Sequence, residues 1–279
     1  METDAPQVTK IGLIAGNRDF PLHVARAAKT LGIEVVAIAI EEETSKELAA
    51  LVPAIHWLRL GQLGKLVEIL KQASVAHILL AGQVHPSHIT RQLAHLDGEG
   101  MKLLAKAATS QGRDILKIFC EYLEGRGFTL LDSATFLRAW VPDAGVLTKR
   151  RPTPAEQDAV NYGMRKAAVL AAAGIGQTVV VKQRAVVALE AMEGTDAAIR
   201  RAGEIAGQGT VVVKCAEARH DFRFDIPVVG QGTLEAMVAA GATALGVTAG
   251  KTLLMDRPLL VAYADEKNLA MVAVPEAPQ

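Results

Sequence analysis

The feature that most constrains the fold is an alternation of short apolar runs with amphipathic helical segments. Apolar runs at 10–16 and 77–82 each end in glycine, and a β-branched run covers 34–40. Apolar residues recur at helical spacing in the segments between them, at 20–32 and 63–74. Strand–helix–strand units in this order predict a parallel sheet with helices on both faces.

A proline-rich, basic stretch separates the two halves of the chain. It spans residues 141–158 and ends in Thr153, Pro154 and Glu156, a pattern typical of a helix start. Helical and strand patterns alternate again after it, and 279 residues suit about two domains. We therefore predict an α/β protein with an N-terminal Rossmann-like parallel-sheet domain at 1–135 and a C-terminal mixed α/β domain at 136–279.

Composition narrows the class of protein. The formal net charge is zero, so no overall positive field favours nucleic acid as a partner. The acidic N-terminus does not resemble a signal peptide, and the apolar runs are shorter than the roughly 20 residues that span a bilayer. Cys120 and Cys215 are isolated in apolar surroundings, which predicts buried thiols. We expect a cytoplasmic protein whose membrane contact, if any, is peripheral.

The first strand ends in a loop that suits an anion. In "GLIAGNRDFP", Gly16 closes the strand and Arg18 precedes a helix, whose first amides favour negative charge. The G-x-G-x-x-G pattern of nicotinamide-binding enzymes is missing, which disfavours an oxidoreductase. A phosphate pocket and a plain strand–helix turn both remain open, and Arg18 could hold a diphosphate through two hydrogen bonds.

Two further groups allow either a functional or a structural interpretation. His85 and His88 follow a strand, where exposed loop residues are commoner than a zinc site. Thr148, Lys149 and Arg150 begin a basic cluster that is either a solvated turn or a clamp on phosphate.

Acidic residues gather at two places in the second half. Glu190, Glu193 and Asp196 lie around a glycine, where they could bind magnesium, although Asp196 alone suits a helix cap. The second place is "RHDFRFDIPVVG". As a strand, it would present Asp221, Arg223 and Asp225 on one face and two phenylalanines on the other. Such a row suits either surface salt bridges or metal-assisted attack on phosphate.

Several blocks together carry a family resemblance. "GLIAG", "FPLHVARAA", "GVLTKRRPT", "EGTDAAI" and "DFRFDIPVVGQGTLEAM" occur in order along the chain. They resemble the magnesium-dependent UDP-2,3-diacylglucosamine pyrophosphatases of the LpxI type. The resemblance implies a homodimer that hydrolyses UDP-2,3-diacylglucosamine to 2,3-diacylglucosamine 1-phosphate and UMP in lipid A synthesis. It also implies that the C-terminal domain is catalytic, that Mg²⁺ is the cofactor, and that contact with the inner membrane is peripheral.

The resemblance and the residue patterns described above together give roles to residues of this chain. Its acidic strand falls on three expected catalytic residues: Asp221, Arg223 and Asp225. The expected substrate contacts are Gly16, Arg18, Thr148, Lys149, Arg150, Glu193 and Thr195. The expected metal ligands are Asp225, Asp221, Glu190, Glu193 and Asp196. The chain departs from the family pattern at three positions: Asn17, His85 and His220. An inactive nucleotide-sugar-binding protein of the same fold therefore stays open as the alternative.

Overall fold

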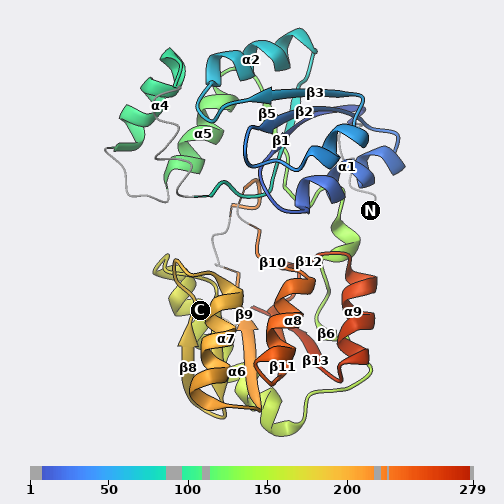
Figure 1. Ribbon diagram of the computed structural model, residues 1–279, viewed down its shortest axis with the longest axis vertical. Coiled ribbons are helices and arrows are strands. Elements are labelled where there is room, and N and C mark those ends of the chain that lie inside the picture. The colour runs from blue at the N-terminus through green and yellow to red at the C-terminus, as the bar shows by residue number, and fades with distance from the viewer. Residues whose placement is uncertain (1–7, 86–95, 109–113, 217–220, 225, 277–279) are drawn as a thin grey trace. The chain divides into compact units, whose positions relative to one another are not determined.

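The computed structural model describes residues 8–85, 96–108, 114–216, 221–224 and 226–276 (Figure 1). The chain forms two compact units. The first unit is Met1–Phe136 with Phe222–Phe224, and the second is Leu137–Asp221 with Asp225–Gln279. A short segment from late in the sequence therefore belongs to the N-terminal unit.

The first unit is an alternating α/β structure. Its elements are β1 (Lys10–Ala15), α1 (Phe20–Thr30), β2 (Glu34–Ile40), η1 (Lys46–Ala50), β3 (Ala54–Leu58), α2 (Leu63–Gln72), β4 (His77–Ala81), α4 (Gly98–Ala108), α5 (Asp114–Glu124) and β5 (Thr129–Leu130). The strands form one five-stranded sheet in the order β3-β2-β1-β4-β5, and all pairs are parallel. The parallel sheet predicted from the sequence is confirmed.

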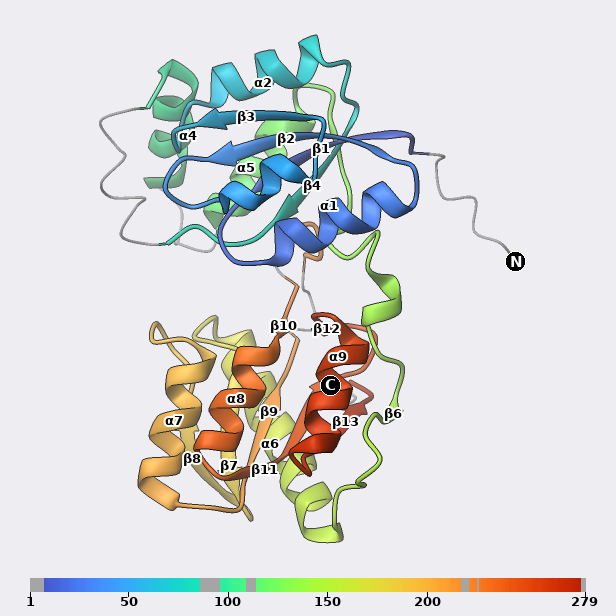
Figure 2. The ribbon, with the colours of Figure 1, turned by 45° about the vertical axis from the view of Figure 1, so that its right-hand side comes forward.

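Helices cover both faces of this sheet (Figure 2). Helix α1 buries Leu22, Val24 and Ala28, whereas Leu70 of α2 and Leu123 of α5 share a core with β1, β2 and β4. The central strands are therefore apolar on both sides, which explains why they appear in the sequence as continuous apolar runs.

The second unit contains a longer set of elements. They are η3 (Arg138–Trp140), β6 (Gly145–Val146), α6 (Pro154–Ala172), β7 (Thr178–Lys182), β8 (Ala185–Leu189), α7 (Thr195–Ala206), β9 (Thr210–Lys214), β10 (Val228–Val229), α8 (Gln231–Ala239), β11 (Ala242–Thr248), β12 (Leu253–Leu254), α9 (Arg257–Glu266) and β13 (Ala270–Val274). Six strands form a mixed sheet in the order β6-β13-β11-β9-β7-β8, and β10 pairs with β12.

The two faces of the mixed sheet are buried by different helices. Helix α6 packs on the face that carries Val179 and Val181, while α7, α8 and α9 pack on the face that carries Val180 and Val212. Alternate residues of each strand thus enter separate cores. The predicted mixed α/β fold is confirmed.

The predicted helix start after the proline-rich stretch is also confirmed. Thr153 caps α6, and its hydroxyl accepts from the Glu156 amide while the Glu156 carboxylate accepts from the Thr153 amide. This reciprocal capping box satisfies two amides that the helix leaves open.

Among the described residues, the structure contains neither a membrane-spanning helix nor a disulfide. No helix among them has the length and apolar character needed to cross a membrane. Both cysteines are buried and form no disulfide, as predicted.

Candidate active site

Two loops meet at the carboxyl edge of the first sheet. The Gly16 amide donates to the Ala81 carbonyl at 2.8 Å, and the Asn17 amide donates to the Gln83 carbonyl at 2.7 Å. A β-carbon on Gly16 would lie 2.3 Å from the Gln83 oxygen, and one on Gly82 would lie 2.6 Å from the Asn17 oxygen. Both positions therefore require glycine, which explains the glycines that close the two strands.

Arg18 has a strained backbone beside these loops. Its φ is +64°, in the left-handed region that non-glycine residues seldom occupy. It directly precedes Asp19, the N-cap residue of α1, whose side chain forms no capping hydrogen bond, and the first turn of α1 holds no acidic residue. The backbone amides at the start of α1, other than at Pro21, which has no N–H, therefore favour an anion.

Glu43 ties the two loops together. Its carboxylate accepts from the Asn17 side-chain amide at 2.8 Å and from the His85 backbone amide at 2.7 Å. The other side-chain atom of Asn17, Oδ1, is buried and accepts no hydrogen bond from the residues that the structure describes. A buried acceptor in this state suits a ligand that brings an N–H or O–H group.

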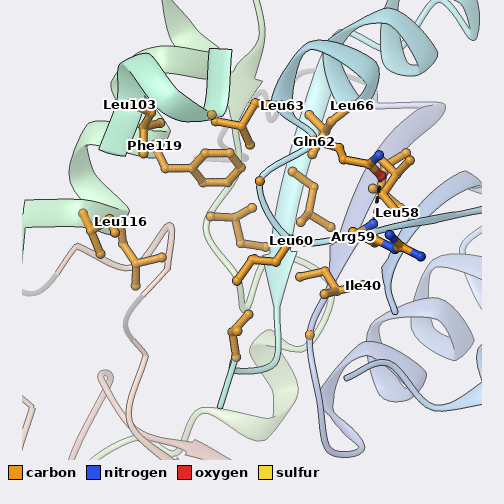
Figure 3. A pocket seen from close by; sticks show the side chains of 18 of the residues that line it. Ile40, Leu58, Arg59, Leu60, Gln62, Leu63, Leu66, Leu103, Leu116 and Phe119 are labelled. Carbon is orange, nitrogen blue, oxygen red and sulfur yellow. Dashed lines mark hydrogen bonds between the residues drawn. The ribbon is translucent and has the colours of Figure 1, made fainter. Parts of the chain in front are cut away.

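An apolar pocket of about 230 Å³ opens in the same unit. Its wall includes the ends of the first four strands and the facing sides of α4 and α5. Figure 3 shows Leu103, Leu116 and Phe119 on one side of it. Gly16 belongs both to this wall and to the loop that leads into Arg18. The pocket and the loop are therefore adjacent.

The segment expected to be an acidic strand has a different conformation. Residues 222–224 form a turn, so the prediction of one strand presenting Asp221, Arg223 and Asp225 on a single face is wrong. Phe224 does enter a core, as expected, but that core lies beneath α2 and α5 of the first unit. Asp225 and His220 lie outside the described residues, as does His88.

Contacts with Ser133 and Glu124 fix this turn. The Ser133 amide donates to the Phe222 carbonyl at 2.9 Å, and its hydroxyl lies 2.9 Å from the Arg223 carbonyl. The Arg223 guanidinium pairs with Glu124 at the end of α5. Arg223 is thus held by a carboxylate of the first unit. Asp221 precedes the turn and is half-buried.

A polar cluster lies on one edge of the mixed sheet. Glu190 follows β8, Lys214 ends β9 and Thr195 begins α7. Strands β8 and β9 both run antiparallel to β7, so their carboxyl ends share an edge. The Lys214 ammonium donates to the Thr195 hydroxyl at 2.9 Å, and that hydroxyl donates to Glu190 Oε1 at 2.7 Å. The structure thus joins two of the predicted residues, Glu190 and Thr195, by a direct hydrogen bond and adds Lys214, which the sequence analysis missed.

The positive charge of Lys214 stabilises the ionised form of Glu190 in this cluster. Burial would raise the pKa of Glu190, but the Lys214 charge and hydrogen bonds from Thr178, Thr195 and the Gln177 amide hold that pKa below its ordinary value. Lys214 itself is 8% exposed. A lysine closing an otherwise apolar strand was the sequence signal available for this site.

The other two acidic residues of the predicted metal cluster point elsewhere. Glu193 Oε1 pairs with Arg201 at 2.6 Å, and Asp196 Oδ1 accepts from the Thr233 hydroxyl at 3.0 Å. Across the described part of the chain, no three acidic, histidine or cysteine side chains come close enough together to hold one metal ion. Glu190, Glu193 and Asp196 therefore do not gather into one cluster, and magnesium binding by any one of them stays a prediction.

The basic segment before α6 is anchored to the second unit. The Thr148 hydroxyl donates to the Arg150 carbonyl and accepts from the Met271 amide. The Lys149 amide donates to Asp265 at 2.7 Å.

All five N–H groups of the Arg150 guanidinium have protein acceptors. Nη1 and Nη2 each lie 2.9 Å from an oxygen of Glu156. The remaining acceptors are the carbonyls of Arg151, Thr243 and Asn268. A guanidinium has five donors, so none is left for a phosphate. Arg150 therefore stabilises the fold, and its predicted contact with substrate stays a prediction that the Arg150→Ala variant tests.

These observations define a class: an α/β protein of two units whose first unit combines an uncapped helix start with an apolar pocket. Sequence comparison then identifies the family. The model of the LpxI N-terminal domain matches residues 10–140, and that of the LpxI C-terminal domain matches residues 143–272. The chain belongs to the LpxI family.

A curated relative has the same extent. UDP-2,3-diacylglucosamine pyrophosphatase LpxI of Caulobacter vibrioides is 26% identical over 276 residues, which cover 95% of this chain and 97% of the relative.

Solved structures offer only slight similarity. The biotin carboxylase domain of Hydrogenobacter thermophilus 2-oxoglutarate carboxylase is 14% identical, with a TM-score of 0.28 over 72% of this chain and 42% of that chain. A biotin carboxylase subunit of pyruvate carboxylase is 15% identical, with a TM-score of 0.27 over 72% of this chain and 43% of that one. Similarity at this level carries no argument.

Proposed function

We propose that the protein is a hydrolase of lipid A synthesis that cleaves the diphosphate of UDP-2,3-diacylglucosamine. The oxygen of one water forms a bond to the sugar-side phosphorus, and the bond from that phosphorus to the bridging oxygen breaks. The products are 2,3-diacylglucosamine 1-phosphate and UMP, which keeps the bridging oxygen. The proton of the attacking water passes to solvent.

One observation carries this proposal: both LpxI domain models match in order, over nearly the whole chain. The relative from Caulobacter vibrioides, whose name states this substrate, also covers the chain almost from end to end. The first unit adds chemical support, because a nucleotide-linked lipid needs both an anion-favouring loop and apolar surface.

The nucleotide half is assigned to the Gly16–Arg18 loop. The amides at the start of α1 and the Arg18 guanidinium would balance diphosphate charge. The buried Asn17 Oδ1 would accept a hydrogen bond from a uracil N–H or a ribose hydroxyl, since the described residues leave it without a donor. Asn17, a departure from the family pattern, thereby gains a role.

The catalytic groups are assigned to the two ends of the anchored turn. In the sequence, Asp221 and Asp225 flank residues 222–224, and the carbonyls of Phe222 and Arg223 accept hydrogen bonds from Ser133. Carboxylates are ligands that Mg²⁺ prefers, and we assign the metal to these two residues. The ion would supply positive charge that weakens the repulsion between water and diphosphate. Arg223 is assigned a positioning role, since Glu124 already holds it.

Two further properties belong to the proposal. A substrate with two acyl chains resides in the membrane, so we propose peripheral contact with the cytoplasmic face of the inner membrane. We also propose a homodimer, as the family resemblance implies; sedimentation equilibrium of the full chain tests this, and a monomer across the working concentration range would refute it.

The decisive experiment is incubation of the full chain with UDP-2,3-diacylglucosamine, followed by mass spectrometry of the products. Wild type with Mg²⁺ should release UMP and diacylglucosamine 1-phosphate in equal amounts, and chelation should stop this. Asp225→Ala should lower turnover by about 10²-fold or more. Substrate binding without release of UMP would instead indicate an inactive nucleotide-sugar-binding protein.

A further inference from the structure

Ser133 joins two segments of the first unit that are far apart in the sequence. It is 2% exposed and begins a turn at residues 133–136, shortly after β5. Its hydroxyl lies 2.8 Å from the carbonyl of Leu80 in β4 and 2.9 Å from the carbonyl of Arg223. Its backbone amide donates to the Phe222 carbonyl at 2.9 Å. One buried serine thus connects a central strand to the turn at 222–224.

The serine hydroxyl has one proton for two carbonyl acceptors. A hydroxyl is a single O–H donor, so this proton is shared between Leu80 and Arg223 or alternates between them. The backbone amide of the same serine is a separate donor and holds the turn through Phe222. Removing the hydroxyl alone would therefore loosen the turn without detaching it.

The strand that Ser133 contacts also holds the loop of the polar site. Leu80 precedes Ala81, whose carbonyl accepts from the Gly16 amide at 2.8 Å. Consecutive residues of β4 therefore hold the loop that leads into α1 and, through Ser133, the turn at 222–224. The spacing between this loop and this turn is fixed by one strand of the first unit.

Two side chains add further contacts to the turn. Phe224 packs against the core that includes Leu70 of α2 and Leu123 of α5. Arg223 pairs with Glu124 at the end of α5. Backbone hydrogen bonds, an apolar contact and an ion pair thus all restrain these three residues. The residue directly before them is Asp221, to which the proposed function assigns metal binding.

We infer that Ser133 is a positioning residue for the Asp221 carboxylate, an inference that rests on the proposed function. Mg²⁺ demands near-ideal octahedral geometry, so a carboxylate binds it best when its backbone is already fixed. Ser133 fixes the turn that directly follows Asp221, as groups outside a metal's own ligands commonly orient those ligands. Its role is exerted through Asp221 and not by contact with substrate.

The test removes the hydroxyl and leaves the other contacts of the turn in place. Ser133→Ala keeps the amide that donates to Phe222, and Ser133→Thr restores a hydroxyl. Thr135→Ala is the matched control, because the Thr135 hydroxyl donates to the Asp132 carbonyl at 2.6 Å, a bond within the same short segment. Glu124→Ala loosens the turn by a second route, at a partly exposed ion pair, and serves where a Ser133 variant does not fold. Circular dichroism establishes that each variant is folded.

Two properties are measured for each variant. The first is the affinity for Mn²⁺, a paramagnetic probe of the Mg²⁺ site, which requires no turnover. Loss of a group that orients a metal ligand costs roughly 10–100-fold in metal affinity or activity, so Ser133→Ala should weaken Mn²⁺ binding about tenfold. The second is kcat for UDP-2,3-diacylglucosamine, which should fall about tenfold while the Kd for UDP without metal stays unchanged. Ser133→Thr should recover most of both losses, Glu124→Ala should change both in the same direction as Ser133→Ala, and Thr135→Ala should match wild type.

A double-mutant cycle with Asp221→Asn separates positioning from a general structural effect. If Ser133 acts through Asp221, adding Ser133→Ala to Asp221→Asn should lower Mn²⁺ affinity and kcat by less than about twofold. A further loss of about tenfold in the double variant would show that the two residues act independently and would overturn the inference.

Failure of the inference and failure of the proposed function give different results. Normal turnover with wild-type Mn²⁺ affinity in Ser133→Ala, or in Glu124→Ala where the serine variants do not fold, would overturn the positioning role and leave the hydrolase standing. Absent turnover in wild type, with Mn²⁺ binding that still depends on Ser133 and Asp221, would overturn the hydrolase and leave Ser133 as the positioning residue of a metal site.

Discussion

The Arg150–Glu156 pair allows the sharpest quantitative prediction. Glu156 is 13% exposed at its side chain, and Arg150 is 23% exposed. Burial alone would raise the pKa of Glu156, but hydrogen bonds from Arg150, Thr243 and Thr153 lower it to about 2 from an ordinary 4.5. The carboxylate is therefore much more stable in the folded state than in the unfolded one.

The lowered pKa of Glu156 sets the size and the pH dependence of its contribution to the free energy of unfolding. A change of roughly 2.5 units corresponds to about 3.4 kcal/mol at 1.36 kcal/mol per unit, and partial solvent screening reduces this to about 2–3 kcal/mol. Because the folded pKa is depressed, this stability is present above about pH 5. It is lost as the pH falls from there towards 2.

We predict that Glu156→Gln lowers the free energy of unfolding by about 2–3 kcal/mol at pH 7. The difference from wild type should shrink steadily below pH 5, since the variant cannot titrate at this position. Arg150→Ala should likewise destabilise the second unit while leaving KM for substrate unchanged.

Urea unfolding followed by tryptophan fluorescence measures this. Trp57 lies in the first unit and Trp140 in the second, so a Trp57→Phe background makes Trp140 the reporter of the unit that contains Glu156. Asp158→Asn is the matched control: Asp158 lies on the same helix and contacts Arg184 at 2.9 Å through both oxygens, but both side chains are largely exposed. The control should change stability little.

The reasoning would be refuted if the difference in unfolding free energy between wild type and Glu156→Gln did not change with pH. It would also be refuted if Glu156→Gln and Asp158→Asn lost equal amounts of unfolding free energy. A raised KM in Arg150→Ala with undiminished stability would restore Arg150 to the substrate site.

Two further predictions concern the two polar sites. Arg18→Gly should weaken UDP binding about tenfold or more. The free energy of unfolding should stay equal or rise by up to about 1 kcal/mol, because glycine relieves the left-handed backbone. Calorimetric titration with UDP and urea unfolding measure the two quantities, and an unchanged UDP affinity would contradict the prediction. Lys214→Met should destabilise the second unit by about 3 kcal/mol, because it leaves the Glu190 charge buried without its cation. Adding Glu190→Gln should recover part of that loss, and a double variant as unstable as the sum of the two single ones would show that the charges do not interact.

Much of the fold was predictable because its signals are local. Strands buried on both faces produce the apolar runs of both units, and the capping residues Thr153 and Glu156 lie three positions apart. Strand β3 was not predicted from the sequence, because it is short and His56 interrupts its apolar residues. Helix α9 and β13 were likewise not identified.

The sites were harder to predict because their contacts are distant in sequence. Phe222–Phe224 alternates as a strand would, but its carbonyls bond to Ser133, about ninety residues earlier. Glu190 and Asp196 are neighbours in sequence, yet their partners lie on β9 and α8. No local pattern encodes such pairings, so local reasoning grouped carboxylates that the fold separates.

Hydrolysis of UDP-2,3-diacylglucosamine in ¹⁸O-labelled water tests the central claim most directly, because it reports both that water attacks and where. If water attacks the sugar-side phosphorus, mass spectrometry should find one labelled oxygen in diacylglucosamine 1-phosphate and none in UMP. Label in UMP would contradict the proposed regiochemistry, and the absence of both products would contradict the proposed hydrolase itself.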